Sequence, residues 1–137
     1  MGVRLERHEK SALEVAEWLK GRPEVARLLH PALPDDPGHA IWKRDFGRST
    51  GLFGFVLKGD DKDAAILLNA LSLIGLGYSW GGFESLAVPG ELENARTVRP
   101  WGEGPTIRLH IGLEDVADLV ADLERGFAAM AERRAPQ

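Results

Sequence analysis

The sequence lacks several features that would each point to a particular class of protein. It has no cysteine among its 137 residues, which excludes a disulfide framework, a thiolate metal site and a cysteine nucleophile. No stretch approaches the roughly 20 apolar residues of a membrane span, and the N-terminus has no apolar secretory core. Basic residues are scattered and the formal net charge is −4, so nothing indicates nucleic-acid binding. We therefore expect a soluble, cytoplasmic domain without a membrane or nucleic-acid partner.

What the sequence does contain is typical of a globular fold. Hydrophobic residues make up 44% of the chain and charged residues 28%, which is enough apolar material to build a core. This length fits one compact domain and leaves little room for a second, so we expect a single domain over residues 1–137. An amphipathic helical pattern starts almost at Met1, as in a segment taken from a longer protein.

Apolar spacing, β-branched runs and turn residues predict the order of elements. We expect helices over 5–21, 39–46, 64–71 and 114–130, strands over 25–30, 52–57, 72–77 and 106–111, loops over 31–38 and 78–85, and a helical turn over 91–96. Residues 60–63 offer N-cap candidates, and Pro89-Gly90 breaks the chain. Long helices with short strands predict an α+β fold, a small and mostly antiparallel sheet with helices on one face.

Arg108 is the first candidate functional residue. It lies in a predicted strand between Ile107 and Leu109, so its side chain points away from the core. A guanidinium on a rigid strand can bind a carboxylate through two parallel hydrogen bonds. The residues alone leave a second interpretation open, in which Arg108 is an exposed strand arginine or part of a structural ion pair.

The second candidate is the glycine-rich segment Tyr78–Ser85, which contains Ser79 and Trp80. Its glycines allow the backbone to bend sharply or approach a ligand closely. Backbone amides, a serine hydroxyl and an indole wall would form a compact pocket. The alternative is a glycine-rich corner whose aromatic residues fill the core.

Other titratable residues give no site by themselves. The four histidines His8, His30, His39 and His110 do not have a metal-ligand spacing, and we expect surface or capping residues and no metal. His110 follows Arg108 by two positions and would share its strand face. Glu114, Asp115 and Asp118 are explained by the first turn of the last helix.

Five segments together resemble a known family. They are Glu14–Leu19, His30–Pro34, Trp42–Phe46, Tyr78–Ser85 and Ile107–Val116. These segments resemble the C-terminal part of the cystathionine β-lyases, in the Cys/Met-metabolism group of fold-type-I pyridoxal-phosphate (PLP) enzymes. The resemblance runs from about Gly2 to Met130. The group shares a Ser-x-Gly-Gly-x-Glu-Ser core, and Trp80 favours the β-lyase branch.

The resemblance implies roles for three residues. Arg108 matches the arginine that binds the substrate α-carboxylate, and Ser79 and Trp80 match residues that flank it. In the family, PLP supports β-elimination of cystathionine to homocysteine, pyruvate and ammonia. The implied fold is the small C-terminal domain of fold-type-I PLP enzymes, and the implied partner is a cystathionine-like amino acid.

The resemblance also implies what this chain lacks. The family's cofactor lysine lies in a large N-terminal domain, and none of the five lysines here matches its motif. We therefore expect no catalytic or cofactor-binding residue in this chain and no activity alone. Two alternatives stay open: a non-catalytic amino-acid-binding or assembly module that partners a separate large domain, and an inert remnant. The apolar face over 5–19 would be bare without the large domain, which predicts a homo-oligomer.

Overall fold

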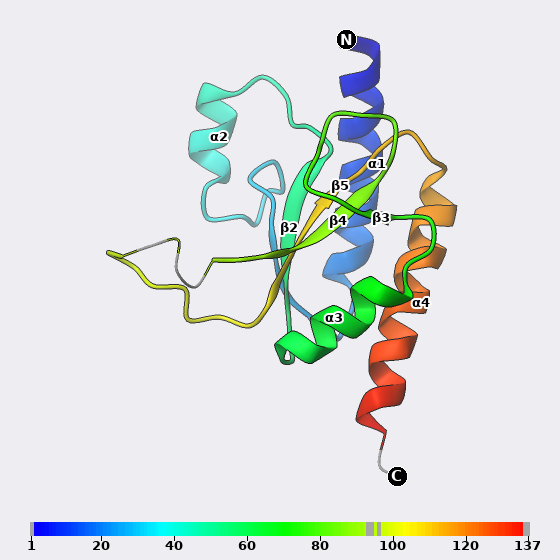
Figure 1. The fold of residues 1–137 in the computed structure, drawn as a ribbon. Coiled ribbons are helices and arrows are strands. Elements are labelled where there is room, and N and C mark those ends of the chain that lie inside the picture. The colour runs from blue at the N-terminus through cyan, green and yellow to red at the C-terminus, as the bar shows by residue number, and fades with distance from the viewer. Residues whose placement is uncertain (1, 93–94, 96, 136–137) are drawn as a thin grey trace.

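A five-stranded sheet forms the centre of the fold, and helices cover one of its faces (Figure 1). The structure is a computed structural model that describes residues 2–92, 95 and 97–135. In chain order the elements are α1 (Gly2–Lys20), β1 (Val25–Leu29), α2 (His39–Asp45), β2 (Leu52–Leu57), α3 (Asp61–Ala70), β3 (Gly75–Leu76), β4 (Leu86–Gly90), β5 (Thr106–His110) and α4 (Val116–Arg134). The predicted α+β class is confirmed.

The strands lie in the order β1-β2-β5-β4-β3. Among the described strands only β3 and β4 pair in parallel, so the sheet is mostly antiparallel, as expected. The central strand β5 is hydrogen-bonded along both edges, and its Arg108 lies opposite Gly54 of β2 and Val88 of β4. Side chains on β5 therefore project from backbone that is held on both sides.

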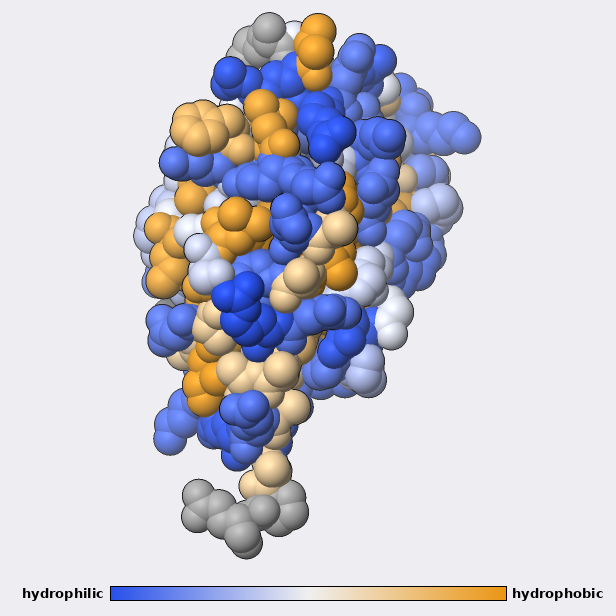
Figure 2. Space-filling view, turned by 90° about the vertical axis from the view of Figure 1, so that its right-hand side faces the viewer, coloured by the Kyte–Doolittle hydropathy of each residue, from blue (hydrophilic) through white to orange (hydrophobic). Residues whose placement is uncertain are grey.

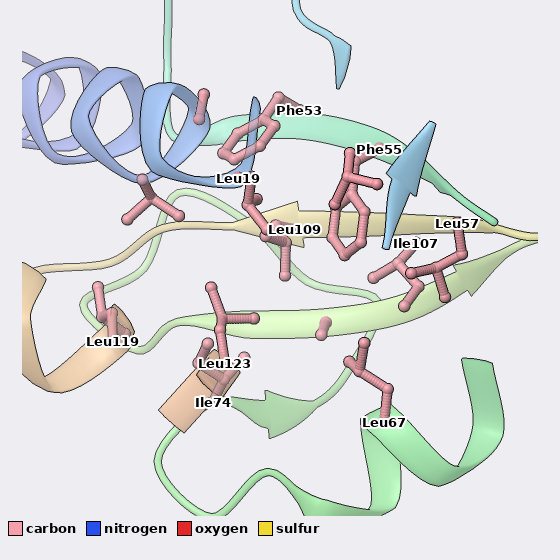
Figure 3. Packing of buried hydrophobic residues seen from close by; sticks show 14 of the residues in the cluster. Leu19, Phe53, Phe55, Leu57, Leu67, Ile74, Ile107, Leu109, Leu119 and Leu123 are labelled. Atoms are coloured by element: carbon pink, nitrogen blue, oxygen red, sulfur yellow. The ribbon is translucent and has the colours of Figure 1, made fainter. Parts of the chain in front are cut away.

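The hydrophobic core lies between the sheet and helices α1, α3 and α4 (Figure 3). Phe55 of β2 and Ile107 and Leu109 of β5 meet Leu123 and Phe127 of α4 there, all without exposed surface. Burying one side chain of this size stabilises the fold by about 1.5–3 kcal/mol. Helix α2 stands apart from this layer (Figure 1) and has no buried residue.

The apolar face of α1 packs on the chain's own core. Ala12, Val15, Ala16 and Leu19 have no exposed surface, and the helix contacts β1 and α4. The prediction that this face is bare is therefore wrong, because the sheet and α4 of the same chain cover it. The homo-oligomer stays a prediction, without this face as its reason. On the face that includes α4, hydrophilic side chains surround smaller groups of hydrophobic ones (Figure 2).

The strand predicted over 72–77 is reduced to two residues by a carboxylate. The backbone N–H groups of Ser72, Leu73 and Ile74 donate to the side chain of Asp122 in α4, at 2.9, 3.0 and 2.9 Å. Because these donors are already satisfied, the segment has no need of a strand partner.

Strand β4 was not predicted, because Pro89-Gly90 indicates a break. Pro89 lies opposite Ile107 of β5. Its backbone nitrogen points to the other edge of β4, the edge toward β3, as does the Ala87 carbonyl, which accepts a hydrogen bond from the Gly77 N–H. Strand β3 pairs only with Leu86 and Ala87, so the N–H that proline lacks would have no ladder partner there.

Helix ends are predicted less well than helices. Asp60 is the N-cap of α3 and forms a capping box with Asp63, as the sequence indicates. Helix α4 starts two residues later than predicted and runs four residues further. The helical turn predicted over 91–96 includes positions 93, 94 and 96, which lie outside the described residues. No helix in the described ranges is both long and apolar enough to span a membrane.

Candidate functional site

Arg108 projects from the sheet face opposite the helices. Its neighbours Ile107 and Leu109 are fully buried in the core, and strand alternation places Arg108 on the other face. Arg108 Nη2 donates to the Tyr78 carbonyl at 2.7 Å, and its guanidinium carbon lies 6.0 Å from the Tyr78 ring centroid. Nε is buried and has no partner among the described residues. The guanidinium thus keeps free donors after its contact with the loop.

The segment that contains Ser79 and Trp80 is held at two points on β5. Arg108 binds the Tyr78 carbonyl, and the Gly81 N–H contacts the His110 ring, 3.1 Å from Nε2 and 3.4 Å from Nδ1. Ser79 and Trp80 lie between these points and are exposed, Trp80 by 65%. No hydrogen bond among the described residues joins either of them to Arg108. The structure therefore brings the three predicted residues to one place without linking them directly.

Glycine is required at the turn of this segment. Gly81 has a φ of +80°, in the left-handed region where residues with a Cβ are strained. This conformation turns the backbone directly after Ser79 and Trp80, whose side chains are exposed.

The far end of the segment is tied to the residues that follow β5. The Ser85 N–H and hydroxyl each donate to Glu114 at 2.7 Å, and the Ser85 hydroxyl accepts from Gly112 N at 2.8 Å. Leu113 N donates to the Phe83 carbonyl at 2.8 Å. Residues 78–85 are thus fastened along residues 108–114 over their whole length.

The sequence pattern predicts Glu114 in the first turn of α4. In the structure Glu114 lies before that helix. Asp115 is the N-cap of that helix and accepts from Ala117, so Glu114 precedes the helix and is free to bind Ser85. Sequence reasoning missed this role. The acidic pair Glu114-Asp115 could have indicated it, because one carboxylate is enough for the cap.

The expectation of surface histidines is wrong for three of the four. His8, His30 and His110 are at most 2% exposed, and burial is the first cause that lowers the pKa of each below its ordinary value of 6.5. His39 is half-buried, and its Nδ1 lies 2.9 Å from the Pro31 carbonyl. No group of three metal-ligating side chains occurs in the part of the chain that the structure describes.

Two hollows adjoin the segment. One of about 340 Å³ is lined by Trp80, Gly81, His8 and His110, among others. The other, of about 350 Å³, includes Tyr78 and Val88 in its lining. Both fall within the size of small-molecule sites. A larger hollow of about 580 Å³ lies between α3 and residues 101–106, and Arg108 does not line it.

Comparison with known proteins agrees with this architecture. The family described as "Cys/Met metabolism PLP-dependent enzyme" matches residues 1–128. The chain belongs to this family. It is 57% identical over 134 residues to a putative cystathionine beta-lyase of Rhizobium johnstonii. This alignment covers 94% of the chain and 34% of that relative. It is 54% identical over 134 residues to a cystathionine beta-lyase of Escherichia coli, covering 93% and 34%.

A more distant member and a solved structure widen the comparison. Human cystathionine gamma-lyase is 39% identical over 133 residues, covering 93% of the chain and 33% of that protein. The O-acetylhomoserine sulfhydrylase of Wolinella succinogenes superposes with a TM-score of 0.76 at 30% identity, over 92% of this chain and 34% of that one. The chain spans about a third of the length of the curated relatives it matches.

The lysines of this member of the PLP-dependent family do not fit the task of holding the cofactor. A lysine that binds PLP must lie beside the site and be partly desolvated. All five lysines are exposed: Lys20 pairs with Asp35 at 2.9 Å, and Lys58 donates to the Pro23 carbonyl at 2.9 Å. No lysine lines either hollow beside residues 78–82.

Proposed function

We propose that this chain is the C-terminal, substrate-carboxylate-binding domain of a cystathionine β-lyase. In the complete enzyme the reaction would be β-elimination of cystathionine to homocysteine, pyruvate and ammonia. The observation that carries the proposal is the Arg108 guanidinium, held on the central strand by the Tyr78 carbonyl at 2.7 Å with donors to spare. The identity of 57% and 54% to proteins named cystathionine beta-lyase supports the choice of reaction.

Arg108 would bind the substrate α-carboxylate through its free N–H groups. One Nη2–H is occupied by Tyr78, which leaves the second Nη2–H and both Nη1–H groups to form a bidentate pair. The bond to Tyr78 and the contact with the Tyr78 ring orient the guanidinium in advance. Less side-chain entropy is then lost when the carboxylate binds.

Ser79 and Trp80 would complete the carboxylate site. Ser79 offers a hydroxyl donor, and Trp80 an indole wall that excludes water from one side of the ion pair. Excluding water strengthens a charge-assisted hydrogen bond. The three residues would therefore orient the amino acid for the reaction. They would take no part in breaking a bond.

We also propose that the chain alone neither holds PLP nor turns over cystathionine, because its lysines are exposed and none lines a hollow beside the segment. The test is to incubate the chain with PLP, record the absorption spectrum, and reduce with borohydride before mass spectrometry of peptides. We expect no PLP absorption band to stay with the protein once free PLP is removed, and no single labelled lysine. A stoichiometric label on one lysine would overturn the proposal.

A further inference from the structure

His8 lies on the inward side of α1 without a hydrogen-bond partner. It has no exposed surface, and both of its ring nitrogens lack a partner among the described residues. Buried polar side chains in proteins are in large majority hydrogen-bonded, so an imidazole with two unsatisfied nitrogens is unusual. A polar group from outside the chain can therefore bind His8 without displacing any existing hydrogen bond.

The hollow of about 340 Å³ beside the segment brings His8 together with apolar side chains. Leu5, Leu52 and Trp80 line it, and His110 lines it beside His8. The two imidazole rings pack edge-on, with 5.0 Å between their centroids. A mostly apolar lining with a few polar groups is the composition of a small-molecule site.

Arg4 adds a positive charge to this hollow. It precedes His8 by one turn of α1, so the two side chains share a face of the helix, and both line the hollow. Arg4 is exposed, and no ion pair among the described residues includes it. The acidic residue closest to it in the chain, Glu6, pairs with Arg48 at 2.9 Å. A guanidinium in this position favours an anion, and a planar carboxylate matches its geometry.

The two imidazoles are neutral near neutral pH. Burial is the main cause that lowers the pKa of His8 below 6.5, and the nearby His110 and Arg4 act in the same direction. The Gly82 carbonyl and Glu114 oppose this effect, although neither forms a hydrogen bond with His8. A neutral imidazole has one N–H donor. His8 can thus donate to a carboxylate oxygen while Arg4 supplies the opposite charge.

We propose that this hollow binds a small monocarboxylate with a short aliphatic body. The carboxylate accepts hydrogen bonds from Arg4 and His8, and the aliphatic carbons pack against Leu5, Leu52 and Trp80. This site is separate from the one proposed for the substrate α-carboxylate, because Arg108 does not line the hollow.

The test is a set of titrations of the 137-residue chain with acetate, propionate and butyrate, followed by nuclear magnetic resonance. The total salt concentration is held constant with sodium chloride, at about pH 7.5, where both rings are neutral. The ring resonances of His8 and the indole N–H of Trp80 should shift saturably with each acid. Affinity should rise by about threefold to fourfold with each added methylene, because each one leaves water for the apolar lining.

An arginine pair on α1 provides matched variants. Arg4→Gln removes the charge at the hollow and should weaken butyrate binding by about threefold to tenfold. Arg7→Gln is the control, because Arg7 is exposed on the same helix and does not line this hollow. It should leave the affinity unchanged. Both positions are exposed, so neither variant disturbs the core.

Three results would overturn the proposal. The first is the lack of a saturable shift at the His8 ring in the wild type, a result that needs no variant. The second is equal affinity for acetate and butyrate, which would leave only a general ionic effect. The third is equal weakening by Arg4→Gln and Arg7→Gln.

The Arg108 Nε–H, followed in the same titrations, reports separately on the proposed function. A shift at Arg108 without one at His8 would overturn this site and support the α-carboxylate role of Arg108. A shift at His8 without one at Arg108 would support this site and count against that role.

Discussion

The Ser85 hydroxyl and the Glu114 carboxylate lie 2.7 Å apart, and the Ser85 N–H reaches the other oxygen of the same carboxylate at 2.7 Å. Ser85 is 1% exposed. This contact closes the far end of the segment that begins at Tyr78, while Arg108 holds its near end. The proposed carboxylate site therefore depends on residues that would not touch the substrate.

Replacing Ser85 by alanine should loosen that closure. The substitution leaves the Gly112 N–H and one Glu114 oxygen without their partner, and a buried group left unsatisfied costs about 1–3 kcal/mol. Urea unfolding should show this loss of stability. Ser49→Ala is a matched control, because the Ser49 N–H keeps its own 2.8 Å bond to Glu9. An unchanged midpoint for Ser85→Ala would contradict the proposed role of the contact.

Gly112→Ala should displace the segment by steric contact. A Cβ at Gly112 would lie 2.2 Å from the Phe83 carbonyl oxygen, and that oxygen belongs to backbone already bonded to Leu113. We expect a loss of about 2–4 kcal/mol in the free energy of unfolding. Gly102→Ala meets nothing within 4 Å and should stay within about 0.5 kcal/mol of the wild type. Equal midpoints for the two variants would contradict this account.

Asp122→Ala should be among the most destabilising substitutions of a polar residue. The carboxylate is 1% exposed and accepts from Ser72, Leu73 and Ile74. Burial opposes its ionisation, but the three amide bonds outweigh burial and hold its pKa below 3.8. Leaving these amides without an acceptor should cost about 2–4 kcal/mol in urea unfolding. Glu124→Ala, at an exposed residue of the same helix, serves as the control. If Asp122→Ala costs no more stability than Glu124→Ala, the role given to Asp122 is refuted.

The buried histidines should make stability fall at mildly acid pH. His8, His30 and His110 have folded pKa values below 6.5 because burial disfavours their charged form. As pH falls through 6.5 the unfolded chain binds protons first, so the unfolded state is favoured. The stability that the neutral rings contribute is fully present above about pH 7 and is lost below it. Urea midpoints between about pH 8 and 5 test this, and stability that rises on acidification would contradict it.

The fold can be predicted from the sequence more fully than the candidate site can. Period-2 alternation at Thr106–His110 and the helical stripe of α4 predict those elements well, because Ile107 and Leu109 and the apolar face of α4 pack in the same core. Strand β4 was missed because the cost of Pro89 depends on a neighbouring strand, which local sequence does not reveal. The strand over 72–77 was predicted too long because Asp122, 48 to 50 residues away, satisfies the amides of residues 72–74.

The same limit applies to the residues around Arg108. Its position on the face away from the core follows from alternation, and the family motif indicates Ser79 and Trp80. The pairing of Glu114 with Ser85 and the burial of His8 against His110 come from contacts across the chain. Neither residue spacing nor composition contains that information.

Pyruvate release from cystathionine tests the central claim most directly. The chain would replace the matching third of the Escherichia coli relative, to which it is 54% identical, and would also be assayed alone with PLP. The account predicts no pyruvate from the chain alone, and activity in the hybrid that Arg108→Ala lowers by about tenfold to a thousandfold in kcat/KM, chiefly through KM. Arg99→Ala, at an exposed arginine before β5, should leave the hybrid unchanged. Pyruvate from the chain alone, or full activity of the hybrid with Arg108→Ala, would contradict the account.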